Sequence, residues 1–162
     1  MAPRLEITVR PYRPGDRDRA IVLAPRLIEG TAPWRDRAGT LRAVEVAVRS
    51  AIDSFRVAGH AVFVAEADAD IVGFVTVSER ISFAGEREAY VGWLVVRAGL
   101  ERRGIGSTLM AVAEHWAIDR RLPCITLETG AANHAARSLY QVLGYEEEDI
   151  RLTKRSLPQK AR

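Results

Sequence analysis

Six consecutive residues in the second half of the chain have the types and spacing of an anion-binding turn. They are Arg102-Arg103-Gly104-Ile105-Gly106-Ser107, and they separate an apolar, strand-like stretch from a stretch with helical periodicity. The first turn of a helix exposes N–H groups without partners, and the helix dipole places positive potential there. The two glycines remove side chains that would keep an anion away from the backbone. The segment therefore predicts a phosphate cradle, to which Arg102 and Arg103 add charge-assisted contacts.

The spacing of this segment disfavours two common nucleotide-binding loops. A dinucleotide fingerprint needs a third glycine three positions after Gly106, where this chain has Leu109. A P-loop needs Gly-Lys followed by Ser or Thr after four spacer residues, and no such run occurs. On this segment alone, a glycine turn that only begins a helix stays open as the plain structural alternative.

The periodicity of apolar residues predicts the elements that would position this turn. Expected strands cover residues 5–10, 61–66, 71–77, 86–96, 124–128 and 145–152, and expected helices cover 16–28, 35–55, 104–120 and 133–143. Gly144 follows the last of these helices, where a C-cap glycine is typical. An antiparallel half followed by a helix-connected half predicts an α/β fold of the α+β type. We expect a single domain whose central mixed sheet is flanked by helices on both faces.

Composition narrows the class of protein. The chain has 162 residues, of which 48% are hydrophobic, and this suits one globular domain. No apolar run approaches the roughly 20 residues of a membrane helix, and residues 1–6 lack the apolar core of a signal peptide. We therefore expect a cytoplasmic location and no membrane partner.

Charge and cysteine content exclude other functions. The net charge is +3 with acidic and basic residues interleaved, so a nucleic-acid partner is not expected, although the pI of about 9.4 motivates that alternative. One thiol, Cys124, excludes an internal disulfide and a cysteine-rich zinc site, and no metal site is predicted. Cys124 lies in an apolar stretch and is expected to be buried.

Two segments resemble the GNAT N-acetyltransferase superfamily. Residues 94–106 resemble its acetyl-CoA-binding motif, in which Gln or Arg, two variable residues, Gly, one variable residue and Gly or Ala follow an apolar strand. Residues 127–145 are similar to its pattern of strand, Asn, Ala, Leu-Tyr, then Gly and an aromatic residue. The leading Gln or Arg of the first motif falls on Glu101. We expect Glu101 to point away from the phosphates, which the arginines and backbone amides would bind.

The resemblance implies a GNAT-like acyl-CoA N-acyltransferase fold over residues 1–153, followed by a polar tail at 154–162. It implies acetyl-CoA as co-substrate and direct acetyl transfer to a primary amine of a small molecule, peptide or protein, in a monomer or a homodimer. The cofactor-binding residues that it implies are Leu94, Val95, Val96, Arg102, Arg103, Gly104, Ile105, Gly106, Ser107 and Asn133. Tyr140 matches the family tyrosine that protonates the leaving thiolate, and a core aromatic is the alternative for it.

The resemblance also implies that the strand ending at Val96 splays from the strand at 124–128. The pantetheine arm would then bond to backbone around Leu94 and Val96. Independently, a glycine within a strand predicts a bulge or a close backbone approach at Gly92. The acceptor amine is expected near residues 30–35 and 81–85, with Trp34 as a lid aromatic or a packing anchor.

The general base is left unassigned, because the family's acidic position falls near Gly92 and Trp93, which cannot take a proton. Glu29, Glu88 and Glu128 are the possible substitutes, and each has an ordinary structural role as its alternative. This gap, together with Glu101, keeps a second hypothesis open: a non-catalytic acyl-CoA-binding regulatory domain on the same fold.

Overall fold

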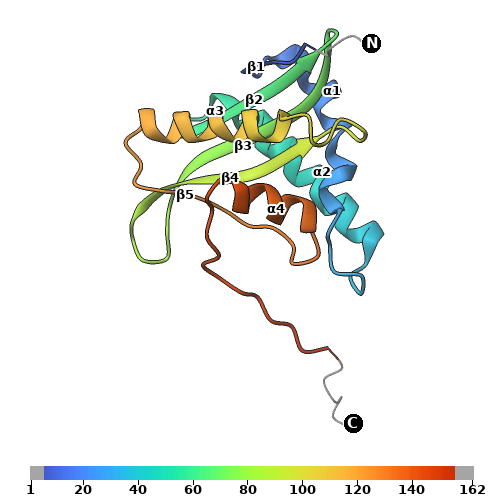
Figure 1. Cartoon of the computed structure of the whole chain (residues 1–162), viewed down its shortest axis with the longest axis vertical. Coiled ribbons are helices and arrows are strands. Elements are labelled where there is room, and N and C mark those ends of the chain that lie inside the picture. The colour runs from blue at the N-terminus through green and yellow to red at the C-terminus, as the bar shows by residue number, and fades with distance from the viewer. Residues whose placement is uncertain (1–5, 156–162) are drawn as a thin grey trace.

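The computed structural model describes residues 6–155, and its centre is one five-stranded mixed sheet with the order β1-β2-β3-β4-β5 (Figure 1). The strands are β1 (Thr8–Pro11), β2 (His60–Ala67), β3 (Asp70–Ile81), β4 (Arg87–Val96) and β5 (Ile125–Leu127). Neighbouring strands from β1 to β4 are antiparallel, whereas β5 is parallel to β4. The mixed sheet expected from the sequence is therefore confirmed.

Helices cover both faces of this sheet. They are α1 (Arg17–Ile21), α2 (Arg37–Asp53), α3 (Ile105–Asp119) and α4 (His134–Val142), with short 3-10 helices η1 (Pro14–Asp16), η2 (Ala24–Ile28) and η3 (Ser54–Arg56). Helices α3 and α4 pack on one face, and α1, η2 and α2 pack on the other (Figure 1). No helix among residues 6–155 is both long enough and apolar enough to cross a membrane.

Each face of the sheet has its own apolar core. On the α3 face, Ile105, Leu109 and Ala113 pack on alternate strand residues such as Val75 and Val91. On the α1 and α2 face, residues from both helices pack on the intervening strand positions, and these include Ala20, Ile21, Val48, Ile52, Val64, Phe74 and Val95. Apolar residues three and four apart in α3 thus form the stripe that the sequence pattern predicts.

Three expectations from the sequence were wrong. No strand exists over residues 145–152, where four consecutive acidic side chains begin at Glu146 and oppose extended pairing by mutual repulsion. The helix expected over 16–28 is divided into η1, α1 and η2, because Pro25 has no N–H to donate to the carbonyl of Ile21. Cys124 is exposed, because β5 begins one residue later. Most of the expected tail at 154–162 lies outside the described residues.

A buried carboxylate holds the start of the chain on the sheet. Asp16 is 2% exposed, and it accepts hydrogen bonds from Arg10 Nη1 at 2.7 Å, from Arg19 Nη2 at 2.8 Å and from the backbone N–H of Arg13 at 2.8 Å. Arg10 also pairs with Glu66 of β2. The Arg10 guanidinium lowers the pKa of Asp16 below its usual value. The network thereby ties η1 and α1 to β1 and β2.

We predict that Asp16→Asn lowers the free energy of unfolding by about 3 kcal/mol at pH 7, because it removes the buried carboxylate that Arg10 and Arg19 share and leaves Arg10 with Glu66 alone. The folded-state pKa of Asp16 lies below 3.8, so its stabilisation is complete above about pH 4 and disappears as the pH falls through the folded-state pKa. Urea unfolding at pH 7 and at pH 3 measures both effects. The control is the exposed Asp18→Asn on α1, and equal stability of the two variants would contradict the prediction.

Candidate active site

A β-bulge in β4 lies at the centre of the site. Thr76 of β3 pairs with Trp93, but the next residue, Val77, pairs with Val91, so Gly92 is the extra residue. The hydroxyl oxygen of Thr76 accepts a hydrogen bond from the backbone N–H of Trp93 at 3.0 Å. A Cβ on Gly92 would lie only 3.1 Å from that oxygen. The bulge predicted at Gly92 is therefore confirmed, and a glycine leaves room for the hydrogen bond that holds it.

The bulge reverses which side chains of β4 face which core. Before it, Ala89 and Val91 pack with α3, whereas after it Trp93 and Val95 pack with α1 and α2. Without the extra residue, Val91 and Trp93 would face the same side, since side chains alternate along a strand. The bulge therefore turns the second half of β4 relative to the first.

Beyond the bulge, β4 and β5 separate. Their pairing runs from Ala89 with Ile125 to Val91 with Leu127 and goes no further. The N–H of Arg97 donates to the carbonyl of Val72 on the β3 side at 2.7 Å. Backbone groups alternate along a strand, so those of Leu94 and Val96 face the opposite side, where β5 has ended. The structure therefore leaves the backbone of Leu94 and Val96 without a strand partner, as a splayed sheet requires.

A cleft of about 170 Å³ opens at this separation. Its walls come from four places: η2 with the segment after it, β4 around the bulge, the end of β5 with the loop after it, and α4. The lining residues include Leu27, Glu29, Gly30, Thr31, Val91, Gly92, Trp93, Leu94, Leu127, Glu128, Thr129, Gly130, Asn133, Ala136 and Tyr140. Segments that are distant in the sequence thus converge on the end of the β4–β5 pairing.

Two loops touch backbone to backbone beside this cleft. Gly30 adopts a φ of +81°, and a Cβ there would collide with the Cβ of Asn133. A Cβ on Gly130 would lie 2.5 Å from the carbonyl oxygen of Gly30. Glycine is required at both positions, because any side chain would push the two loops apart.

The turn before α3 has the form of an anion cradle. Gly104 is the N-cap with a φ of +81°, and the first helical hydrogen bond of this turn runs from the N–H of Thr108 to the carbonyl of Gly104 at 2.9 Å. The N–H groups of Ile105, Gly106 and Ser107 precede this bond and have no intrahelical partner. A Cβ on Gly104 would meet nothing within 4 Å, so the space in front of the turn is open.

Three charged side chains, those of Glu101, Arg102 and Arg103, come directly before the cradle. Glu101 accepts a hydrogen bond from Arg26 Nη2 at 2.7 Å and another from the backbone N–H of Gly99 at 2.8 Å. Its carboxylate is therefore bound to η2 and to its own loop. Arg102, which has a φ of +59°, and Arg103 are both exposed beside the first turn of α3.

A sequence profile described as the acetyltransferase (GNAT) family matches residues 29–145, which contain the cradle, the bulge and the cleft. The chain belongs to this family. It is also similar to the uncharacterized N-acetyltransferase YhfO of Bacillus subtilis (strain 168), with 31% identity over 88 residues, or 54% of this chain and 59% of that protein. It is 30% identical over 151 residues to mycothiol acetyltransferase of Tsukamurella paurometabola, which covers 88% of this chain and 49% of that protein.

The chain thus spans less than two thirds of the length of each of these relatives. Among solved structures, PaiA N-acetyltransferase from Thermoplasma acidophilum in complex with coenzyme A superposes with a TM-score of 0.75 at 19% identity. The superposition covers 91% of this chain and 94% of that one. The likeness shows that the GNAT fold is shared.

In this GNAT chain, Tyr140 of α4 both lines the cleft and packs at the margin of the α3-side core. Its ring lies 5.8 Å from that of Tyr145, whose hydroxyl donates to Glu114 Oε1 at 2.9 Å. Burial raises the pKa of Tyr140 to about 12, so its phenol keeps its proton at neutral pH. The two alternatives weighed from the sequence, a core aromatic and a site residue, are compatible in this position.

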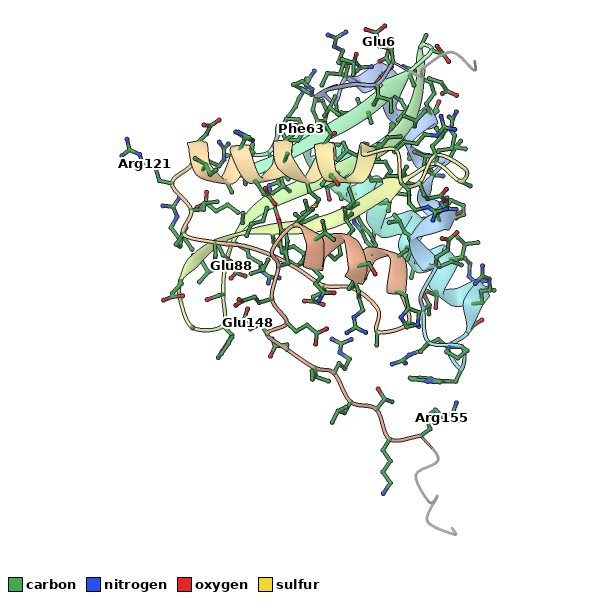
Figure 2. All side chains as sticks on the ribbon, viewed as in Figure 1. Glu6, Phe63, Glu88, Arg121, Glu148 and Arg155 are labelled. Atoms are coloured by element: carbon green, nitrogen blue, oxygen red, sulfur yellow. The ribbon has the colours of Figure 1, made fainter. Side chains whose placement is uncertain are left out.

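The candidate bases occupy different environments. Glu29 and Glu128 line the cleft. Glu88 is buried at the hairpin end of β4 (Figure 2), where it accepts hydrogen bonds from Arg80 Nε at 2.6 Å and from the hydroxyl of Thr126 at 3.2 Å. This places Glu88 in a structural network and leaves Glu29 and Glu128 as the carboxylates at the cleft, where Glu29 also forms an ion pair with Arg26 at 3.1 Å.

Of the other residues predicted to form the site, some line the cleft and others are buried in the two cores. Asn133 lines the cleft, and its side chain caps α4 by accepting from the N–H of Ala136 at 3.2 Å. The side chains of Val95 and Ile105 are buried in the two cores, and the backbone of Val95 faces β3. The structure therefore brings together Leu94, Asn133 and Tyr140. The connection at 81–85 is not among the cleft-lining residues.

Sequence reasoning missed two residues that shape the site. Thr76 reads as an ordinary strand residue, although its hydroxyl fixes the bulge. Gly73 lies across from Val96 in β3, and a Cβ there would come within 2.8 Å of the carbonyl oxygen of Val95. A glycine inside an apolar strand indicates a close backbone approach, and this signal could have identified Gly73 from the sequence.

We predict that Thr76→Val lowers the free energy of unfolding by about 1–2 kcal/mol, because it leaves the part-buried N–H of Trp93 without its acceptor. The cleft should also lose its shape, so coenzyme A should bind more weakly. Thr76→Ser keeps the hydroxyl and is the matched control. Urea unfolding and calorimetric titration of coenzyme A measure the two effects, and a Thr76→Val variant equal to the serine variant in both would refute this role.

Proposed function

We propose that this protein transfers the acetyl group of acetyl-CoA to a primary amine, by direct attack and without a covalent enzyme intermediate. The observation that carries the proposal is the separation of β4 from β5. It leaves the backbone of Leu94 and Val96 unpaired beside a cleft that also contains Tyr140 and Asn133. Membership of the GNAT family and the coenzyme A complex of a protein with the same fold support it.

The chain's own residues fit the cofactor in two places. The pyrophosphate would lie on the N–H groups of Ile105, Gly106 and Ser107, with Arg102 and Arg103 beside it. The pantetheine arm would enter the gap beside β4 and bond to Leu94 and Val96 as an added strand does. Acetyl-CoA supplies the thioester, and the protein supplies the position and the hydrogen bonds.

Transfer needs stabilisation of charge at two atoms. As the amine nitrogen attacks the thioester carbon, negative charge develops on the carbonyl oxygen, and a backbone N–H of β4 that faces the gap is placed to donate to it. The C–S bond then breaks, and the developing thiolate accepts a hydrogen bond from the hydroxyl of Tyr140. With a pKa of about 12, Tyr140 is a weaker acid than a thiol, so its main effect is to stabilise the developing thiolate.

The attacking amine must also lose its proton. Glu29 and Glu128 are the carboxylates that line the cleft, and we assign the proton to one of them, directly or through water. The second hypothesis, a regulatory domain that binds acyl-CoA without transfer, remains the alternative, because no carboxylate stands on the bulged half of β4.

Thiol release from acetyl-CoA, measured over a panel of small amines and lysine peptides beside calorimetric titration of coenzyme A, tests the proposal. We expect binding together with amine-dependent release. Binding without release on any amine would favour the regulatory domain. Absence of binding would exclude both.

We predict that Gly104→Val weakens coenzyme A binding by more than tenfold. A β-branched residue is strained at a φ of +81°, and its side chain would occupy the open space in front of the cradle. Gly85→Val is the matched control, since Gly85 has a φ of +85° and equally open surroundings but lies in the β3–β4 hairpin. Calorimetry should separate the two variants, and equal affinities would remove the cradle from the proposal.

We predict that Tyr140→Phe lowers kcat by about 10- to 100-fold with little change in the affinity for coenzyme A, because it removes only the donor to the thiolate. Tyr145→Phe is the control. Its ring lies next to that of Tyr140, but its hydroxyl is bound to Glu114 and does not line the cleft. Steady-state kinetics on folded protein measure the effect. A normal kcat in Tyr140→Phe would leave this tyrosine as a core aromatic.

A further inference from the structure

A second hollow adjoins the cleft on the side where α2 begins. It has a volume of about 70 Å³ and is lined by Ile28, Thr31, Ala32, Pro33, Arg35, Arg37 and Thr40. Thr31 lines both this hollow and the cleft. One continuous surface therefore runs from the end of the β4–β5 pairing, past Thr31, to the first residues of α2. We call the second hollow the arginine hollow.

The two ends of this surface carry opposite charge. Glu29 and Glu128 line the cleft, whereas Arg35 and Arg37 line the arginine hollow. Eight arginines among residues 6–155 form ion pairs with carboxylates, as Arg17 does with Asp53 at 2.8 Å. Within residues 6–155, neither Arg35 nor Arg37 forms an ion pair with a carboxylate.

The positive charge of the hollow comes from side chains and not from the end of the helix. Asp36 caps α2 by accepting hydrogen bonds from the N–H groups of Ala38 and Gly39, each at 3.1 Å. Those donors are therefore already used. The guanidinium groups of Arg35 and Arg37 and the hydroxyl of Thr31 are the groups left for a ligand.

An aromatic ring holds the cations at this place. The guanidinium carbon of Arg35 lies 4.3 Å from the ring centroid of Trp34, and that of Arg155 lies 5.7 Å from the same ring. Figure 2 shows Arg155 on the segment after α4, near the end of the molecule where α2 begins. Trp34 is 40% exposed, so it acts as a partly open platform for the two cations. Cations gathered without carboxylate partners make a region of positive potential that favours an anion.

We propose that the acceptor is a small amine that also carries an anionic group, a carboxylate or a phosphate. The ammonium end enters the cleft beside Glu29 and Glu128, and the anionic end pairs with Arg35 and Arg37 in the arginine hollow. The inference rests on the proposed acetyl transfer and names its substrate class.

This placement is consistent with the chemistry of transfer. The bound ammonium loses one proton to become a nucleophilic amine, and its nitrogen loses a second proton as it forms a bond to the thioester carbon. The C–S bond breaks, the thiolate takes up one of these protons, and the other is released to water. The products are an N-acetyl amine and coenzyme A. The amide is neutral where the ammonium was positive, so the product loses its attraction to Glu29 and Glu128 and keeps only its contact with the arginines.

Matched acceptors test the proposal. The probes are ω-amino acids from glycine to 6-aminohexanoate, each beside its carboxamide, and O-phosphoethanolamine beside ethanolamine. We expect kcat/KM to favour the anionic member of a pair by about 10- to 100-fold, because charge-assisted hydrogen bonds are lost in the neutral one. The series also separates a carboxylate from a phosphate and indicates the distance between the amine and the anion.

Arginine variants locate the effect. Arg35→Gln and Arg37→Gln should each reduce the preference for the anionic acceptor over its carboxamide by about tenfold or more, because the charged partner of the anion is lost. Arg42→Gln is the matched control, because Arg42 is exposed on the same helix but lines neither the cleft nor the hollow. It should leave the preference at the wild-type value.

Calorimetric titration of the anionic amines into the protein loaded with coenzyme A separates this inference from the proposed function. Acetylation of amines without an anion preference, or a preference unchanged in both arginine variants, would overturn the arginine hollow and leave the transferase standing. Transfer to lysine peptides alone would overturn it in the same way. Binding that depends on Arg35 and Arg37 without transfer would support the hollow and contradict acetyl transfer. If the protein neither binds nor acetylates these amines, both the arginine hollow and the proposed acetyl transfer are rejected.

Discussion

The hydrogen bond from the Trp93 N–H to the Thr76 hydroxyl is the contact on which the site depends. It holds the one-residue bulge at Gly92, and the bulge reverses the facing of β4 between Val91 and Trp93. Ala89 and Val91 therefore face the α3-side core before the bulge, and after it Leu94 and Val96 contact that core while Trp93 and Val95 face the α1 and α2 side. The same turn carries β4 away from β5 and leaves the backbone of Leu94 and Val96 free. Fold and cleft thus share one local irregularity.

Local signals explain how much of the structure the sequence could predict. Gly104 and Gly106 predicted the turn before α3, and Gly92 predicted the bulge, because glycine in these contexts reports a backbone requirement directly. Helix α3 was predicted to within a residue at each end from its apolar stripe. The strand predicted over 145–152 does not form, because the prediction followed the apolar residues and gave no weight to the four acidic residues near its start. Pro25 divides the helix predicted over 16–28, although the apolar residues of that segment do have helical spacing.

The contacts between distant segments could not be predicted in this way. Thr76 accepts its hydrogen bond from Trp93 because the register of β3 and β4 makes them neighbours. Arg26 of η2 donates to Glu101, which lies 75 residues further along the chain. Cys124 looked buried because its neighbours are apolar, yet β5 is too short to include it. The position of Glu88 in an Arg80 network also follows from pairing between strands. Each of these features depends on contacts between segments that are distant in the sequence, and the residues of a single segment do not reveal such contacts.

The contact of Gly30 with Gly130 and Asn133 has a consequence for how such a cleft can diversify. The loop that leads to Arg35 and Arg37 rests directly on the backbone that begins α4, with no side chain between them to absorb a change in length or path. A loop taken from another acetyltransferase would meet this rigid surface unless it brought a matching segment at 130–133. The two loops can therefore be replaced only together, although about a hundred residues of chain separate them.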